Sequence, residues 1–338
     1  MKQILTFTVI TIIGFYTGKM TDINPIASDG FSYFASFALV LGLYGSVIGI
    51  DLKAVAKQKW LVVIIVTVAV PLQIMATGFV MYLIYPVSLS FLLAVAIDQI
   101  DPLSVDTLLQ DKDRMSDSAK GILRIWASFD DPVTVLFGFL VLLPLVAGTS
   151  LGFTFQKYLL GMALNIIPAL VLWFIHKKTK YFQQKTFAII TLIIVLVFSF
   201  LTESFLLAAI TGLILRPLPT KFFEKSTFIL YHIIVFVVGM SLFSYGIDYR
   251  LGILLALVEF FIIQPVSALI FFNGTASEVF RIAYSQQNGL TTLLMGIAFQ
   301  SFGINVLHIL LPAIIVINIL NISINKLYTW KEEKGLIT

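Results

Sequence analysis

The sequence of 338 residues contains no cysteine, and only 12% of its residues are charged. Without cysteine, the chain forms neither disulfide bonds nor metal sites with thiolate ligands. The charged fraction is about half of that in an average soluble domain. A soluble domain of this length needs a polar shell, so the scarcity of charge excludes that class of protein.

Other features of soluble or β-barrel proteins are also missing. The three histidines, His176, His232 and His308, lie far apart and show no metal-ligand spacing. No hydrophilic stretch is long enough for a separate soluble domain. Strand-length segments with two-residue alternation are missing as well, which argues against an outer-membrane barrel. The net charge of +4 mainly reports membrane topology, so we expect no nucleic-acid partner.

Apolar residues make up 59% of the chain, and its mean hydropathy is +1.00. Apolar stretches of about 20 residues are typical of membrane-spanning helices. We expect twelve such segments, of which the eighth is short: residues 3–18, 31–50, 60–84, 88–110, 118–147, 151–176, 182–202, 204–215, 226–247, 251–272, 278–303 and 304–325. We interpret the first segment as a retained helix, because no small-residue cleavage site of a signal peptide follows it.

Basic residues gather in alternate loops. They follow the second, fourth, sixth, eighth and twelfth segments: Lys53, Lys57, Lys59; Lys112, Arg114, Lys120; Lys177, Lys178, Lys180, Lys185; Arg216, Lys221, Lys225; and Lys326, Lys331, Lys334. Cytoplasmic loops carry an excess of Lys and Arg. We therefore predict a multi-pass protein of the cell membrane, embedded in the lipid bilayer, with both termini cytoplasmic and an even number of helices.

Acidic residues fall where the chain is most apolar. Asp98 and Asp101 lie near the middle of the fourth segment, and Asp130 and Asp131 near the middle of the fifth. A charged side chain at the centre of a spanning helix costs about 2.5–3.5 kcal/mol, and such residues usually line transport pathways. A buried network that only fixes helix packing is the alternative. Because neighbours on a helix point about 100° apart, Asp130 and Asp131 should face different partners.

Two segments carry signs of interruption. If the fourth segment is helical, Asp98 and Asp101 share a face of it, because they are three residues apart. Pro102 removes a backbone donor, so this helix should be kinked or unwound around "DQIDP". The eleventh segment has a similar weak point at "SQQNG", residues 285–289. Two interrupted helices in different halves of a chain indicate a transporter site at the bilayer midplane.

Four stretches in order resemble the monovalent cation:proton antiporter superfamily, which includes the sodium/proton exchangers. They are "IDPLSVDTLLQ", with Asp101 and Pro102 in register with a fourth-helix motif, "SFDDPVTVLFG", "TESFLLAAITGLIL" and "FVVGMSL". The resemblance covers most of the chain. It implies an all-α polytopic fold of inverted repeats with two broken, crossing helices. It also implies a core domain at 60–147 and 251–325, a dimerisation domain at 1–50 and 151–247, and a homodimer.

The resemblance also implies roles for individual residues. Asp131 would be the ion- and proton-binding carboxylate, and Asp130 would occupy a position that is Asn or Asp in the family. Asp101 would offset the positive ends of the half-helices. Carboxylate and amide oxygens suit hard cations such as Na⁺ or Li⁺. We expect Asp98, Gln99 and Ser128 to support the site.

The sequence departs from the family pattern at three places. Ile100 replaces a Thr before the fourth-helix Asp. The tenth helix usually carries a Lys or Arg, but here "LALVEFFIIQPVSAL" offers Glu259 or Gln264. Asn288 stands where many relatives have an eleventh-helix Arg. A Glu at the tenth-helix position adds negative charge instead of a cation, unless that residue faces outer water.

These observations predict a secondary active transporter and not an enzyme. It would exchange a monovalent cation, Na⁺ first and Li⁺ or K⁺ as alternatives, for protons, with no organic cofactor. A buried carboxylate holds its proton strongly until a cation displaces it, which couples the two fluxes. A sodium-coupled solute symporter and a membrane sensor with a degenerate site remain alternatives. The HExxH motif of an intramembrane hydrolase is missing, although an Asp101–Asp131 pair leaves an aspartyl hydrolase open.

Overall fold

The computed structural model describes residues 2–48, 50, 59–100, 105, 115–147, 155–178 and 181–336. All regular secondary structure in these residues is helical, as the composition predicts. Each of the twelve predicted apolar segments contains a helix or part of one. A helix satisfies its own backbone hydrogen bonds, which is what a segment in a water-free layer requires.

The helices of the first half are α1 (Lys2–Thr21), α2 (Asp29–Ile48), α4 (Lys59–Ile64), α5 (Val70–Ile84), α6 (Leu89–Ile97), α8 (Asp117–Phe137), α9 (Leu143–Ala147) and α10 (Phe155–Lys178). Those of the second half are α11 (Lys185–Leu201), α12 (Phe205–Ile214), α13 (Thr220–Tyr245), α14 (Tyr249–Val258), α15 (Gln264–Phe271), α16 (Ala276–Ala283), α17 (Leu290–Ser301) and α18 (Leu307–Glu333). Short 3₁₀ turns lie at Pro25–Ala27 and Tyr181–Gln183.

Within the described residues, seven helices are long and apolar enough to cross a membrane by length and composition. They are Gly30–Ile48, Lys59–Ile84, Asp117–Val146, Leu159–Lys178, Thr220–Tyr245, Tyr249–Phe271 and Leu307–Glu333. Shorter apolar helices cover Lys185–Leu201, Phe205–Ile214 and Leu290–Gln300. The protein is therefore a multi-pass membrane protein.

Three of the long spans contain a five-residue π turn: η2 (Ile65–Ala69), η3 (Gly138–Leu142) and η5 (Glu259–Ile263). In each case the second residue of the following α segment is a proline: Pro71, Pro144 and Pro265. A proline ring clashes with the carbonyl four residues earlier in an α-helix. The wider π turn moves that carbonyl aside, so the helix continues past the proline. Such turns often occur at functional sites.

The fourth and eleventh segments are interrupted. Helix α6 ends at Ile97, and Asp98, Gln99 and Ile100 are not helical. The end of the helix before Asp98 agrees with the predicted kink or unwinding around "DQIDP". Asp101 and Pro102 lie outside the described residues. In the eleventh segment, α16 ends at Ala283 and α17 begins at Leu290, which confirms the predicted break at "SQQNG".

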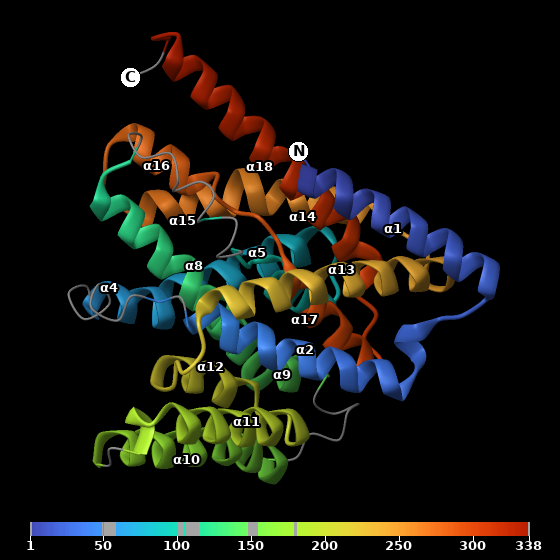
Figure 1. Cartoon of the computed structure of the whole chain (residues 1–338). Helices are drawn as coiled ribbons and strands as arrows, with labels where there is room; N and C mark the ends of the chain where they lie inside the picture. Colours follow the sequence, from blue (N-terminus) through green and yellow to red (C-terminus); the bar gives the residue numbers. More distant parts are fainter. Residues whose placement is uncertain are drawn as a thin grey trace.

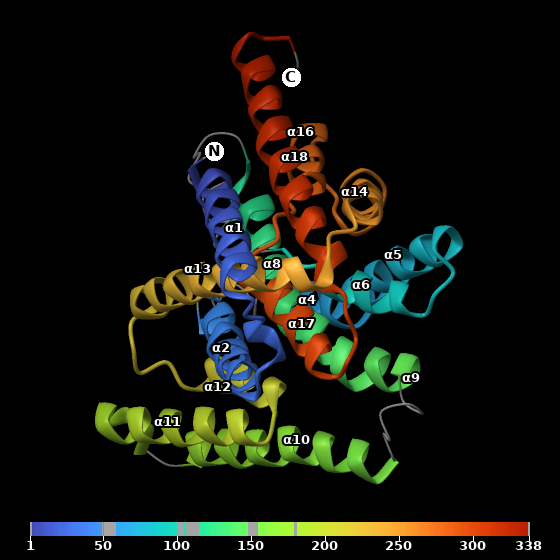
Figure 2. The same cartoon turned by 90° about the vertical axis from the view of Figure 1, so that its right-hand side faces the viewer.

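The helices pack in two sets. In one, α1 packs on α13, α2 on α12 and α13, and α10 and α11 on α12; α10 and α11 lie together at the bottom of both views (Figure 1, Figure 2). In the other, α5 packs on α6 and α14, α17 on α6 and α18, and α14 on α18. The two sets contact each other where α2 of the first set packs on α17 of the second, and where α8 packs on both α2 and α5. A continuous apolar core runs through this contact.

Glycines allow α1 and α13 to pack at close range. A Cβ atom on Gly14 would lie 2.3 Å from the carbonyl oxygen of Phe236, and one on Gly18 would lie 2.1 Å from that of Met240. From the other side, a Cβ on Gly239 would lie 2.6 Å from the carbonyl oxygen of Thr11. The stretch "GFYTG" is thus a GxxxG contact of the kind that joins membrane helices.

Candidate functional site

The two interrupted segments meet in the interior and satisfy each other's backbone. The side-chain amide of Asn288 donates to the carbonyl oxygens of Ile97, at 2.6 Å, and Gln99, at 3.1 Å. Gln286 donates to the same Ile97 oxygen at 3.0 Å. The last carbonyls of a helix have no partner within the helix. Amides of the eleventh segment therefore close the open end of α6.

Asp130 and Asp131 lie beside this crossing on α8, and both are buried. Asp130 Oδ2 accepts from the backbone N–H of Ile100 at 2.7 Å. Asp131 Oδ2 accepts from the hydroxyl of Thr291 at 2.9 Å. The two carboxylates thus contact different interrupted segments, as their adjacent positions on one helix predict. Thr291 is in the first turn of α17, where the helix dipole favours negative charge.

Glu259 begins the π turn η5, and its side chain is 0% exposed. The hydroxyl of Thr77 donates to Glu259 Oε2 at 2.6 Å, and the amide of Gln73 approaches Oε1 at 3.4 Å. Gln73 also donates to the buried Gln264. Glu259 and Gln264, the two candidates for the tenth-helix position, therefore both join the interior polar cluster. Of the two possibilities left open, the one in which Glu259 faces outer water is wrong.

Asp98 is 1% exposed and lies directly after α6. Its carboxyl group lies within hydrogen-bonding reach of the carboxyl group of Glu259, and Gln73 lies beside both. Among the described residues, no donor meets the geometry of a hydrogen bond to either oxygen of Asp98. Asp130 is a further negative neighbour. The interior cluster thus brings Asp98, Asp130, Asp131 and Glu259 into one buried region.

The remaining predicted site residues are placed as follows. Gln99 is buried and accepts a hydrogen bond from the Thr292 hydroxyl at 3.3 Å. Ser128 is half-buried on α8, and no hydrogen bond between it and either Asp carboxylate is found among the described residues. Arg124, on the same helix, is exposed. Asp101 lies outside the described residues.

Five residues of the cluster were not predicted as site residues: Gln73, Thr77, Gln286, Thr291 and Thr292. Gln73 could have been singled out from the sequence. It is an amide close to a proline, Pro71, in an apolar span, as Gln264 is next to Pro265. Gln286 lay inside the predicted break but was not singled out. The threonines gave no signal, since a hydroxyl in a spanning helix often bonds only its own backbone.

The buried basic residues are fewer than the buried acidic ones. Among the described residues, Arg281 is the one Lys or Arg side chain in the buried set. Its guanidinium pairs with Glu332 of α18 and not with the interior cluster. No three acidic or histidine side chains of the described chain are grouped so that they can hold a metal ion together.

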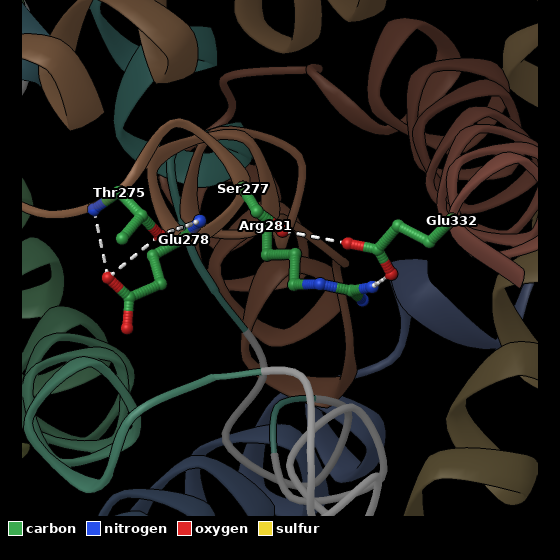
Figure 3. Close-up of polar contacts among 5 residues, drawn as sticks. All are labelled: Thr275, Ser277, Glu278, Arg281 and Glu332. Atoms are coloured by element: carbon green, nitrogen blue, oxygen red, sulfur yellow. Dashed lines mark hydrogen bonds and ion pairs between the residues drawn. The ribbon is translucent and has the colours of Figure 1, made fainter. Parts of the chain in front are cut away.

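Arg281 belongs to a second polar cluster, at the N-terminus of α16 (Figure 3). Thr275 and Glu278 form a reciprocal capping box, and Glu278 also accepts from the backbone N–H of Ser116 at 3.0 Å. Glu332 accepts from Ser277 at 2.8 Å and from Arg281. We call these residues the end cluster: Ser116, Thr275, Ser277, Glu278, Arg281 and Glu332. The end cluster joins the start of α8, helix α16 and the end of α18.

Comparisons with known proteins show the fold. The structure is similar to two solved structures of the sodium proton antiporter MjNhaP1 from Methanocaldococcus jannaschii. The first has a TM-score of 0.70 and 14% identity, over 96% of this chain and 92% of that one. The second has a TM-score of 0.67 and 14% identity, over 98% and 91%. No protein-family model and no curated protein matches the sequence. The chain therefore has the fold of that antiporter.

Proposed function

We propose that the chain is a secondary active transporter that exchanges a monovalent cation, Na⁺ in the first place, for protons by alternating access. One observation carries this proposal: Asp130 and Asp131 are buried where two interrupted helices meet. Interrupted helices bring backbone polar groups and helix ends to membrane depth, where a transporter binds its ion. The similar fold of a sodium proton antiporter supports the same reaction.

Competition for the same oxygens provides the coupling. Asp131 is the central carboxylate, and its contact with Thr291 leaves it near the positive end of α17. A buried carboxylate is stable when a proton or a cation neutralises it, and costly when it is bare. If the bare carrier moves rarely between its inward- and outward-open forms, each ion that enters must be exchanged for protons.

The other residues have supporting roles. Asp130 supplies a second carboxylate, and Asp101 offsets the positive ends of the half-helices. Asp98, Gln99, Ser128, Glu259, Gln264 and Asn288 complete the polar surroundings. Asn288 and Gln99 act through the backbone of the crossing, where their amide and carbonyl groups meet.

We further propose twelve membrane-crossing segments with both termini on the cytoplasmic side of the cell membrane. The end cluster supports this topology. Glu278 contacts Ser116, which follows the basic loop after the fourth segment, and Arg281 of the same helix contacts Glu332 near the C-terminus. A chain with twelve crossings brings all three of these places to one side of the bilayer.

The division into domains is also a proposal. The core domain comprises 60–147 and 251–325, and the dimerisation domain comprises 1–50 and 151–247, arranged as inverted repeats. The core domain is supported by the packing of its helices on one another: α5, α6, α14, α17 and α18. The dimerisation domain is supported in the same way by α1, α2, α10, α12 and α13. In a homodimer, the dimerisation domain would stay fixed while the core moves.

Proton flux in proteoliposomes tests the function. The purified protein is reconstituted, a pH gradient is imposed, and Na⁺, Li⁺ and K⁺ are added in turn while internal pH is followed. We expect Na⁺ or Li⁺ to dissipate the gradient. No response to any of the three ions would favour a sensor, and flux that also requires an organic solute would favour a symporter.

A further inference from the structure

The carboxyl groups of Asp98 and Glu259 make an unusual contact. They come from the end of α6 and the start of η5, they are 1% and 0% exposed, and they lie within hydrogen-bonding reach of each other. Two ionised carboxylates at such range in a dry interior repel strongly, so one of them normally binds a proton. The contact therefore needs either a cation or a proton between the two groups.

The surroundings do not supply a basic side chain. The groups that face the pair are Gln73 and Thr77 from α5, Gln286 from the eleventh-segment break and Asp130 from α8, while Gln264 from α15 lies behind Gln73 and accepts its hydrogen bond. Among these groups Asp130 alone is titratable, and it is acidic. The buried basic side chain of the described residues, Arg281, pairs with Glu332.

Several buried polar atoms around the pair have no partner among the described residues. They are both carboxyl oxygens of Asp98, Oε1 of Gln286 and Nε2 of Gln264. A buried carboxylate without a donor is strongly disfavoured. A protonated carboxyl group differs, because it has an O–H donor of its own. One proton lets Asp98 or Glu259 donate to the other, while Thr77 still donates to Glu259.

We propose that Asp98 and Glu259 hold one proton between them, at a site separate from Asp130 and Asp131, and that this proton stays bound while those carboxylates exchange theirs. The proton takes the place of a basic side chain, and it leaves the pair with one negative charge. Both carboxyl groups are buried beside the amides of Gln73 and Gln286, with Gln264 behind Gln73, and this burial accounts for the retention of the proton. The proposal concerns a site outside the exchange reaction and does not require transport.

Infrared spectroscopy of the purified chain in lipid tests this directly. A protonated carboxyl group gives a C=O stretch that an ionised carboxylate lacks, and the band shifts in D₂O. We expect one such band to persist at alkaline pH in the wild type and in Asp131→Asn. The double variant Asp98→Asn/Glu259→Gln should lose it. Asp22→Asn is the matched control, because Asp22 is exposed and its φ of 56° suits Asn.

A second variant covers the case in which the double variant does not fold. Glu259→Lys places an ammonium group beside Asp98, so the shared proton is no longer needed and the band should vanish from a folded protein. Two results would overturn the proposal: a wild type without a protonated carboxyl group at alkaline pH, or a band that survives in either variant. Since none of these measurements involves flux, a failed antiport assay leaves the result unaffected.

Discussion

Acidic side chains in two regions of this molecule have different kinds of partners. In the end cluster, Glu332 meets the guanidinium of Arg281 and the hydroxyl of Ser277 (Figure 3). In the interior, the Asp98–Glu259 pair meets amides and a hydroxyl. A hydrogen bond to a charged group contributes about 1.5–3 kcal/mol, and a neutral one about 0.5–1.5 kcal/mol. The end cluster holds its helices together through a charged pair, whereas the interior acids meet only neutral donors among the described residues.

The largest effect should come from the carboxylate that we place in the exchange reaction. Asp131→Asn keeps the size of the side chain and its contact with Thr291, but it removes the group that proton and cation share. We expect flux to fall to the level of empty liposomes while the protein elutes as a folded species. Asp22→Asn, which removes an exposed acid, should transport normally. Wild-type flux from Asp131→Asn would remove Asp131 from the mechanism.

Breaking the end cluster should affect stability before transport. Arg281→Gln leaves Glu332, which is 20% exposed, without its cation, so we expect a loss of about 2–3 kcal/mol, below the range for a fully buried pair. Thermal unfolding in detergent measures this loss. The charge swap Arg281→Glu/Glu332→Arg should restore part of it. If the swap is no better than the sum of its single variants, the ion pair does not stabilise the protein.

Asp130→Asn should change the net charge moved in each transport cycle, while exchange itself continues. Asn can still accept from the backbone N–H of Ile100, so the local contact survives. The variant carries one negative charge fewer, and we expect residual flux with a weaker response to an imposed membrane potential. Flux at several potentials, in vesicles clamped with K⁺ and valinomycin, measures this. Equal voltage responses of variant and wild type would exclude Asp130 from the stoichiometry.

The smallest effect should come from the hydroxyl that contacts Asp131. Thr291→Val removes one hydrogen bond to the Asp131 carboxylate and preserves the shape of the side chain. A loss of about 1.5 kcal/mol, the lower end for a hydrogen bond to a charged group, corresponds to roughly a tenfold change in apparent cation affinity. Thr291→Ser, which keeps the hydroxyl, is the control and should remain near the wild type. An unchanged affinity in Thr291→Val would show that the hydroxyl does not influence ion binding.

Much of the fold could be predicted from local sequence. Long apolar runs require helices in a membrane. The "SQQNG" stretch, with three amide side chains and a glycine, predicted the break that the structure contains. The acidic residues could be singled out because charge is expensive at membrane depth. The chemistry of single residues was sufficient for these predictions.

Other parts of the candidate site depend on tertiary packing. Thr77 and Glu259 lie 182 residues apart in sequence, and nothing local indicates that their side chains meet. Thr291 gave no sign of its contact with Asp131 for the same reason. The interruption around "DQIDP" was predicted, but nothing local indicated that the amides of Gln286 and Asn288 donate to the carbonyl oxygen of Ile97. The π turns were missed because the sequence analysis treated every span as regular helix.

The π turns also bear on how this sequence should be aligned with other sequences. A π turn amounts to one extra residue in an α-helix, and removing that residue rotates everything beyond it by about 100°. Three spans contain such an insertion. A gap-free alignment of such a span with a regular α-helix therefore offsets the faces of the two helices by about 100° beyond the π turn. Homologues of this chain should accordingly be sought with single-residue gaps permitted at residues 65–69, 138–142 and 259–263.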